Sequence, residues 1–573
     1  MAEELTVISE RVDDIPVLLA QQERMGIQPL MDKHFATHGN WQGVSLGWVA
    51  VGWLTHILSQ ADHRLNHAQP WVAKRLETLR GCTQQPVRAL DFSDDRLGDV
   101  LRALSGDEQW DAFEGELNQC LLRVYDLGAE RVRLDSTPVS GYWEITPDGL
   151  FQLGHSKGGQ AGQPQVKVML AALDPLGMPV ATDVLSGNRA DDPLYIPSIT
   201  RVRESVGHGG LLYVGDCKMA SLDTRAFVQA GGDFYLCPLP ETQLSSETLG
   251  TYLTPVWTEE QALTPIYREK TTGEQELVAE GYERTETLTA VVGGETITWT
   301  ERRLVTRSLK HAQAGERALR KRLAKAQRVL ASLNERGRGK KRFRELASLR
   351  QAAEAVLERH RVQGLLQLSY QDITHERAVR RYEGRAATVR VEREVRVTVM
   401  VDETAVEAAV RRLGWRVYAT NQPAQQLTLA HAVLAYRGQY TVERAFGRLK
   451  GRPLSVTPMY VQRDDHATGL IRLLSIGLRV LTLLEFTVRC RLEAEGAQLA
   501  GLYAGNPKRT TARPTAERLL EAFQEITLTV IQEPRRIRRH LTPLSDLQQR
   551  ILALLDFSPR IYTRVGANSC KPP

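Results

Sequence analysis

The sequence predicts an α/β protein built on a mixed sheet with helices packed against it. Between residues 130 and 240, short apolar and β-branched runs bounded by turn residues alternate with longer helical stretches. The predicted strands cover 131–135, 166–173, 179–184, 211–216 and 234–237. Helical stretches at 191–206 and 221–229 flank the fourth strand. Three close strands followed by strand–helix–strand alternation are typical of a mixed sheet.

Changes of pattern along the chain predict an interrupted fold with helical ends. We expect a helical amino-terminal domain over 1–110, the first part of the core over 111–240, an insertion over 241–410, the second part of the core over 411–494 and a helical carboxyl-terminal region over 495–573. A strand at 415–420 is expected to open the second part of the core.

The insertion itself combines two patterns. Residues 241–303 are polar and strand-like. Residues 308–365 have a helix composition broken once at 337–339, which predicts a helical hairpin. Residues 389–401 then keep Val at most odd positions, a period of two that marks a half-buried strand or hairpin.

Charge is concentrated in the helical hairpin. The chain carries 74 Lys and Arg against 68 Asp and Glu, a formal charge of +6. Residues 301–350 alone hold 17 basic and four acidic residues, so the rest of the chain is slightly acidic. A basic hairpin of this kind either neutralises phosphate or is a solvated arm that packs on its own chain or on a second subunit.

The composition excludes several classes of protein. Six Cys without a C-x-x-C pair fit neither a disulfide framework nor a zinc ribbon, and they indicate free thiols in a reducing cytoplasm. No secretory signal is visible at the amino terminus. The apolar stretches 44–58 and 469–486 are too short or too often interrupted by charge to span a membrane, so both predict core helices.

Two of the predicted strands end in aspartate, at Asp135 and Asp216. A carboxylate at the end of a buried strand is costly unless something pairs with it, which makes each a candidate metal ligand. The alternative is that Asp is simply frequent in the turns that follow strands.

A third element is the helical stretch from Tyr436 to Lys450. Tyr436, Glu443 and Lys450 are seven residues apart, which turns a helix by about 700° and puts all three on one stripe. A solvated amphipathic face has the same spacing, and Gly438 weakens the expectation of one unbroken helix.

In combination, these residues resemble the catalytic core of bacterial insertion-sequence transposases of the Asp-Asp-Glu class. The branch it resembles carries a Tyr-x2-Arg-x3-Glu-x6-Lys signature, and Leu-Asp135-Ser-Thr, Tyr-Val-Gly-Asp216 and Tyr436 to Lys450 match its order. Gln439 stands where the signature has Arg, and Gln cannot supply charge.

The resemblance implies a ribonuclease H-like fold with Asp135 on the first strand, Asp216 after the fourth and Glu443 on a later helix. The three carboxylates would hold two Mg²⁺ or Mn²⁺ ions per active site, because oxygen ligands favour these cations. The implied activity is cleavage at the ends of an insertion sequence followed by strand transfer into target DNA.

The resemblance also implies partners and a location. The enzyme would act on double-stranded DNA, at terminal inverted repeats and target sites, as a homodimer in the synaptic complex, in the bacterial cytoplasm and at the nucleoid. The candidate DNA-binding residues are Tyr436, Arg437, Gln439, Lys450, Trp299 and Lys157. Two alternatives stay open: a ribonuclease H-like nuclease that cleaves without joining, and an inactive, domesticated DNA-binding protein, against which the intact acidic residues argue.

Overall fold

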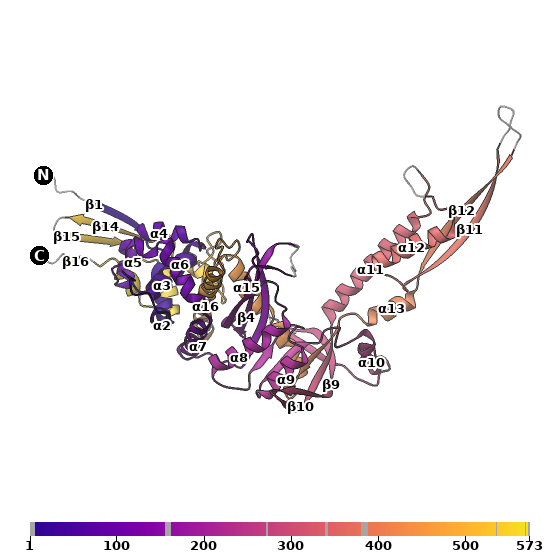
Figure 1. Ribbon diagram of the computed structural model, residues 1–573, viewed down its shortest axis with the longest axis horizontal. Helices are drawn as coiled ribbons and strands as arrows, with labels where there is room; N and C mark the ends of the chain where they lie inside the picture. Colours follow the sequence, from indigo (N-terminus) through magenta and orange to yellow (C-terminus); the bar gives the residue numbers. More distant parts are fainter. Residues whose placement is uncertain are drawn as a thin grey trace.

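The chain folds into a body, which holds both termini at one end, and a long arm that projects from its other end (Figure 1). This computed structural model describes residues 6–154, 162–270, 273–337, 342–379, 388–533, 536–567 and 569–570. The arm and the body enclose an angle, so the molecule is V-shaped in this view.

A mixed sheet forms the centre of the body, as the sequence predicts. Its strands are β2 (Arg131–Ser140), β4 (Pro164–Leu173), β5 (Met178–Ser186), β6 (Leu212–Val214) and β7 (Phe234–Pro238). Their order is β5-β4-β2-β6-β7, with antiparallel pairing among the first three and parallel pairing of β2, β6 and β7. The short β3 (Gln152–Leu153) also pairs with β4. β4 is buried along nearly its whole length, which explains its almost continuous apolar sequence.

The helices between these strands lie where the sequence places them. α8 (Tyr195–Val206) connects β5 to β6, and α9 (Leu222–Ala230) connects β6 to β7. α8 packs against β4 and β5, whereas α9 packs against β7, β9 and β10.

The β-rich part of the insertion extends the same sheet. β13 (Trp415–Thr420) pairs with β7 on one side and with β10 (Glu295–Ser308) on the other, and β9 (Gln275–Val292) and β8 (Thr264–Glu269) follow. One ten-stranded sheet therefore runs through both parts of the core and the insertion. The expectation of strand-like structure throughout 241–303 is wrong at α10 (Ser246–Trp257), where Ser245 caps a helix.

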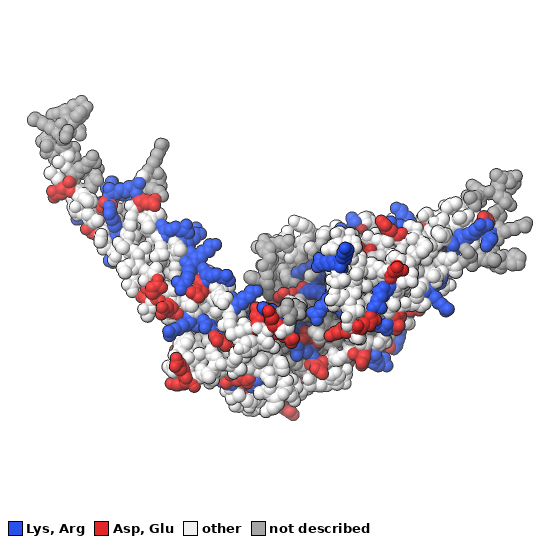
Figure 2. Space-filling model, turned by 180° about the vertical axis from the view of Figure 1, so that it is seen from behind, with Lys and Arg blue, Asp and Glu red and all other residues white. Residues whose placement is uncertain are grey.

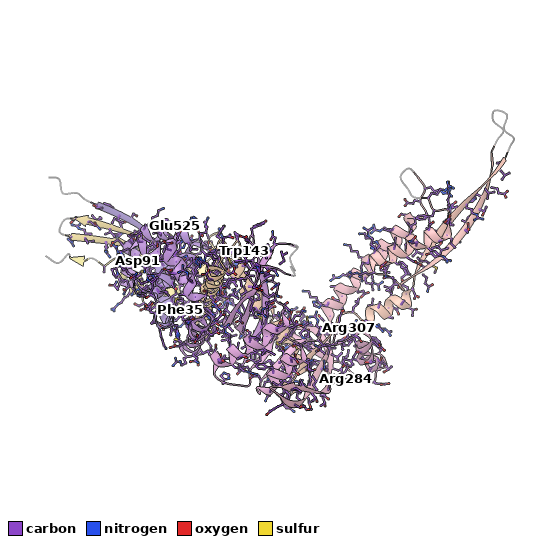
Figure 3. All side chains as sticks on the ribbon, in the orientation of Figure 1. Phe35, Asp91, Trp143, Arg284, Arg307 and Glu525 are labelled. Atoms are coloured by element: carbon purple, nitrogen blue, oxygen red, sulfur yellow. The ribbon has the colours of Figure 1, made fainter. Side chains whose placement is uncertain are left out.

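The described part of the arm consists of two long helices, a long β-hairpin and a short third helix. It contains α11 (Leu309–Ser332), α12 (Leu346–His360), β11 (Leu366–Val379), β12 (Thr388–Val401) and α13 (Glu403–Arg411). The two helices lie in the stretch where a helical hairpin is predicted. At the base of the arm, Arg307 donates to the Leu413 carbonyl at 3.3 Å and pairs with Glu280 at 3.5 Å (Figure 3).

The amino-terminal helices pack together with the end of the chain. They are α1 (Ile15–Arg24), α2 (Ile27–His34), α3 (Leu46–Gln60), α4 (Leu65–Ala73), α5 (Leu76–Thr83), α6 (Asp94–Leu104) and α7 (Asp107–Val124). A second sheet, in the order β1-β14-β15-β16, joins β1 (Thr6–Arg11) to β14 (Thr527–Glu533) and β15 (Arg536–Leu541). The sequence analysis does not predict this sheet, because strand pairing across more than 500 residues leaves no local signal.

Where the structure describes the chain, the long helix α16 is followed by three short carboxyl-terminal helices. They are α17 (Ala516–Glu521), α18 (Asp546–Leu555) and α19 (Arg560–Thr563), and the last strand is β16 (Ser569–Cys570). Among the described residues, α16 (Asp464–Ala494) is the one helix long and apolar enough to cross a membrane, but 94% of its most apolar window is buried inside the protein. Its buried arginines pair with acids of α7: Arg472 with Asp107 and Arg479 with Glu114. α16 is a core helix, as predicted for 469–486.

Two buried histidines lie among the amino-terminal helices. His56 on α3 is 2% exposed and its ring packs on Trp71, whereas His63 is 2% exposed and packs on Tyr460. Burial lowers the pKa of each imidazole to about 4, below the ordinary value of 6.5.

These histidines should make the fold sensitive to acid. Because both are neutral when folded but protonate near pH 6.5 when unfolded, their contribution to stability is complete above pH 6.5 and is lost as the pH falls toward 4. Each accounts for up to about 3 kcal/mol. We expect His56→Gln to flatten the dependence of melting temperature on pH over this interval, and the exposed His208→Gln to leave it unchanged. Equal pH dependence in both variants would contradict the assignment.

Candidate active site

Asp135 on β2 and Asp216, just beyond the end of β6, lie side by side on two neighbouring parallel strands. In the register of β2 and β6, Arg133 pairs with Val214, and each aspartate comes two residues later. Neighbouring parallel strands are about 4.8 Å apart, so the two carboxylates lie close together where β6 ends, while β2 continues to Ser140. Both are half-buried. The fold therefore brings the two aspartates together, but the prediction that Asp135 ends its strand is wrong, because β2 continues to pair with β4 as far as Ser140.

Tyr195 on α8 holds the second aspartate. Its hydroxyl donates to Asp216 Oδ1 at 2.7 Å, and the Lys218 backbone N–H donates to the same oxygen at 2.8 Å. Burial raises the pKa of Tyr195 well above its ordinary value, and the charges of Asp216, Asp135 and Asp191 raise it further. The phenol is therefore a fixed donor close to all three carboxylates. No sequence pattern distinguishes Tyr195.

A third aspartate reaches this region from the loop before α8. Asp191 Oδ1 accepts hydrogen bonds from Ser136 Oγ at 2.9 Å and Lys167 Nζ at 2.7 Å. The sequence favours a helix-capping role for Asp191, but its side chain makes no capping hydrogen bond and instead contacts the residue after Asp135. Lys167, a charge inside an otherwise apolar strand, is the sequence signal that could have identified this contact.

The predicted single helix from Tyr436 to Lys450 is two helices. α14 (Leu429–Arg437) ends at Gly438, and α15 (Tyr440–Lys450) begins after Gln439. The prediction that Tyr436 shares a helical stripe with Glu443 is therefore wrong. Lys450 and Glu443 do share α15, which packs against β2.

The two ends of the signature nevertheless approach the aspartates. Tyr436 packs on Tyr418 with ring centroids 4.7 Å apart, and burial, followed by the charges of Tyr418 and Asp216, raises the pKa of Tyr436. Burial lowers the pKa of Lys450, and the carboxylate of Asp135 opposes this shift. Glu443 is exposed, and in the described part of the chain no hydrogen bond or ion pair involves its carboxylate.

Close packing by Arg133 accounts for the break between α14 and α15. Arg133 is 2% exposed, pairs with Asp174 at 2.9 Å and donates to the Ala435 carbonyl at 2.6 Å. A Cβ on Gly438 would lie 2.5 Å from Arg133 Nη2. Glycine at this position lets a buried guanidinium on the strand of Asp135 pack directly against the junction that orients α15.

We expect Gly438→Ala to destabilise the protein by about 1–3 kcal/mol, because the added methyl group displaces Arg133 from its buried bonds. Thermal unfolding measures the change. Gly447→Ala on α15 is the matched control, since a Cβ there meets nothing within 4 Å and alanine favours a helix by up to about 1 kcal/mol. Equal melting temperatures for Gly438→Ala and the wild type would refute the packing role.

The oxygen donors of Asp135 and Asp216 suit Mg²⁺ or Mn²⁺, and neither Cys nor His takes part in the pair. Among the described residues, however, no group of three or more His, Cys, Asp or Glu is placed to hold a metal ion. The expected trio is thus only partly assembled: two aspartates are adjacent, and Glu443 stands apart on α15.

The structure corrects several predicted DNA contacts. Trp299 is 6% exposed and its indole donates to the Tyr235 hydroxyl at 2.9 Å, so it is a core residue and cannot stack on a base. Arg437 donates to the Val278 carbonyl and to Ser308 Oγ, both at 3.0 Å, and so joins α14 to the insertion. Gln439 is half-buried at the start of α15. Lys157 lies outside the described residues.

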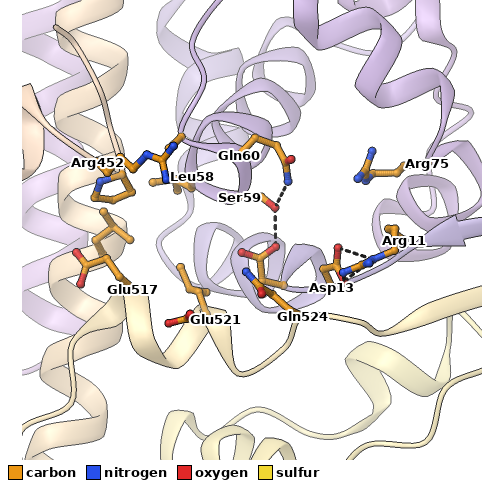
Figure 4. Close-up of a pocket in the computed structure, with 15 residues that line it drawn as sticks. Arg11, Asp13, Leu58, Ser59, Gln60, Arg75, Arg452, Glu517, Glu521 and Gln524 are labelled. Carbon is orange, nitrogen blue, oxygen red and sulfur yellow. Dashed lines mark hydrogen bonds and ion pairs between the residues drawn. The ribbon is translucent and has the colours of Figure 1, made fainter. Parts of the chain in front are cut away.

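A cavity of about 580 Å³ lies elsewhere, between the amino- and carboxyl-terminal regions (Figure 4). Its wall includes Arg75, Arg452 and Glu517. Ser59 donates to the buried Asp14 at 2.7 Å, and burial raises the pKa of Asp14 to about 6. Neither Asp135 nor Asp216 contributes to this cavity, which is a junction between the two ends of the chain.

Comparison with known families identifies the family of the chain. The family model described as "Transposase DDE domain" matches residues 128–478, which span β2 to α16 and include both aspartates and Glu443. The chain belongs to the DDE transposase family. A structure of a piggyBac transposase synaptic complex with hairpin DNA resembles this transposase with 7% identity and a TM-score of 0.31, covering 89% of this chain and 79% of that one. No curated protein matches the transposase.

Proposed function

We propose that this transposase is a metal-dependent enzyme that cleaves DNA at the ends of an insertion sequence and joins the freed ends to target DNA. The observation that carries the proposal is the pair of level aspartates, Asp135 and Asp216, on adjacent parallel strands within the matched family domain. The exposed, unpaired carboxylate of Glu443, on a helix packed against β2, is available as the third catalytic acid.

The strand order supports a ribonuclease H-like arrangement of the core. Three antiparallel strands, β5-β4-β2, continue into two parallel strands, β6 and β7, joined through α8 and α9. The first aspartate lies on the first strand of this set and the second follows the fourth, in the order that the resemblance implies. We also propose that the ten-stranded sheet is this core extended by the insertion.

Each residue of the site has a defined task in the proposed reaction. Asp135, Asp216 and Glu443 provide the negative charge that binds divalent cations, on which DDE transposases generally depend. A pair of Mg²⁺ or Mn²⁺ ions would activate the attacking oxygen and stabilise the leaving oxygen of the phosphodiester. Tyr195 fixes the orientation of Asp216 through its hydroxyl, and Lys450 provides a positive charge beside Asp135 for a DNA phosphate.

The partners follow from the same proposal. The substrates are double-stranded terminal inverted repeats and target DNA, and the active assembly is a homodimer that pairs two ends. A bacterial cell with the enzyme at the nucleoid and no membrane association is the proposed setting. The branch with the Tyr-x2-Arg-x3-Glu-x6-Lys signature is supported by Tyr436 near Asp216 and Lys450 near Asp135.

A plasmid assay tests the function directly. The purified protein is incubated with a supercoiled plasmid that carries the DNA ends flanking its own gene, with Mg²⁺ or with a chelator. Joined products that require the metal support the proposal. Cleavage without joining would indicate a nuclease, and a shifted but uncut plasmid would indicate a DNA-binding protein without activity; either result rejects transposition.

A further inference from the structure

The outer surface of α11 carries a stripe of positive charge. Arg317, Lys321, Lys325 and Arg328, here called the basic stripe, are all exposed. At 100° per residue they fall within a sector of about 80°. The buried residues of the same helix, which include Leu319, Leu323, Ala326 and Leu330, lie on the opposite side and pack into the core of the arm.

The basic stripe is not neutralised by the protein. Within the described residues, none of its four side chains forms an ion pair, whereas the neighbouring Arg320 pairs with Glu316 at 2.9 Å. Its members follow one another at intervals of four, four and three residues, a spacing at which like charges repel on a helix. An arrangement that is unfavourable in the free protein becomes favourable once a polyanion binds.

The stripe lies on the inner side of the V. α11 runs along the side of the arm that faces the body, opposite β4 and α15 (Figure 1). Seen from behind, basic side chains gather on the arm along the hollow that separates it from the body (Figure 2). α11, which carries the basic stripe, therefore lies across this hollow from the part of the body that holds β4.

We propose that the basic stripe binds the sugar–phosphate backbone of duplex DNA lying in this hollow, and so holds the DNA against the catalytic face. The proposal rests on the proposed function and adds the surface that binds the DNA substrate of the transposase. The stripe is about 16 Å long from Arg317 to Arg328, a length of duplex that carries about ten phosphate charges, so each cation has a phosphate partner.

Other partners fit this surface less well. A membrane-bound amphipathic helix needs an exposed apolar face, but the apolar face of α11 is already buried in the arm. A second copy of α11 would bring like charges together. Contacts to phosphates do not distinguish one base from another, so the stripe contributes binding affinity without sequence preference.

The test uses the full-length protein and a fluorescent duplex of arbitrary sequence. We expect Lys321→Gln combined with Arg328→Gln to weaken binding about tenfold or more, and to reduce the slope of log affinity against log salt by about 1.8 between about 0.05 and 0.2 M salt. The matched control is Arg320→Gln with Arg322→Gln, which removes the same charge from the flanks of the stripe. Both double variants should melt no lower than the wild type, since neither loses a buried contact.

Each possible result supports or rejects the binding role of the basic stripe. Equal losses in the two variants would show a general charge effect and overturn the stripe. Unchanged DNA binding together with altered subunit association would make the arm a protein interface and also overturn it. If the wild type binds the duplex and cleaves the plasmid while the stripe variant does both equally well, the stripe fails and the proposed function stands. If the wild type itself binds no DNA, both fail.

Discussion

Replacing Asp216 or Asp135 with Ala should reduce DNA strand cleavage about a thousandfold or more while leaving binding of the element ends nearly intact. The two carboxylates lie side by side on neighbouring parallel strands, so either loss removes half of the negative charge that this pair offers to a cation. A thousandfold loss corresponds to about 4 kcal/mol of transition-state stabilisation, the scale on which bound metal ions act. Glu443→Ala should have the same effect.

The measurements are plasmid cleavage and binding of a labelled end fragment, made on the same protein preparations. Asp223→Asn is the control, because this exposed carboxylate lies in the first turn of α9, outside the site. Full cleavage by Asp135→Ala or Asp216→Ala would remove that residue from the catalytic set. Full cleavage by Glu443→Ala would mean that another acidic residue is the third catalytic carboxylate. Asp191, which accepts a hydrogen bond from Ser136, would be the next residue to test.

Replacing Glu114 with Ala should destabilise the protein by about 3–5 kcal/mol, because it leaves a buried charge without a partner. Glu114 on α7 is 1% exposed, and its carboxylate accepts from Arg479 of α16 at 2.6 Å and pairs with Arg201 of α8. It also accepts the Thr182 backbone N–H at 3.2 Å. One side chain thus joins the amino-terminal helices to the catalytic sheet and to the core helix.

The melting temperature should fall by several degrees in Glu114→Ala, and less in Glu114→Gln, which keeps hydrogen-bonding capacity but not charge. Glu108→Ala, at an exposed position on the same helix, is the control and should melt like the wild type. A melting temperature for Glu114→Ala equal to that of Glu108→Ala would show that the buried arginines find other partners.

Local patterns were sufficient for the strands that carry the aspartates. The runs before Asp135 and Asp216 are short, largely β-branched or apolar and bounded by turn residues, so the two strands are predictable from neighbours in sequence. The end of the first strand was not predictable, because its continuation to Ser140 depends on pairing with β4. The two long helices of the arm are also predictable from sequence, because a helix is built from contacts between residues three and four apart.

Contacts between segments distant in the chain could not be predicted from the sequence. Gly438 breaks the predicted helix because Arg133, about 300 residues away in sequence, packs against it. Trp299 resembles an exposed aromatic in a polar segment, but its indole donates to Tyr235 on β7, which lies on the far side of β13 in the sheet. Asp191 and Tyr195 join the site only because α8 returns over the sheet.

The sequence by itself determined the alternation of elements, the positions of the three candidate catalytic acids and the concentration of positive charge in the insertion, because each depends on residues close together in the chain. The tertiary structure decided that the insertion continues the central sheet through β13, that the two ends of the chain share a sheet, and that α11 lies on the side of the arm that faces the body. These features arise from strand pairing and packing between remote segments, whose partners are chosen by the whole fold.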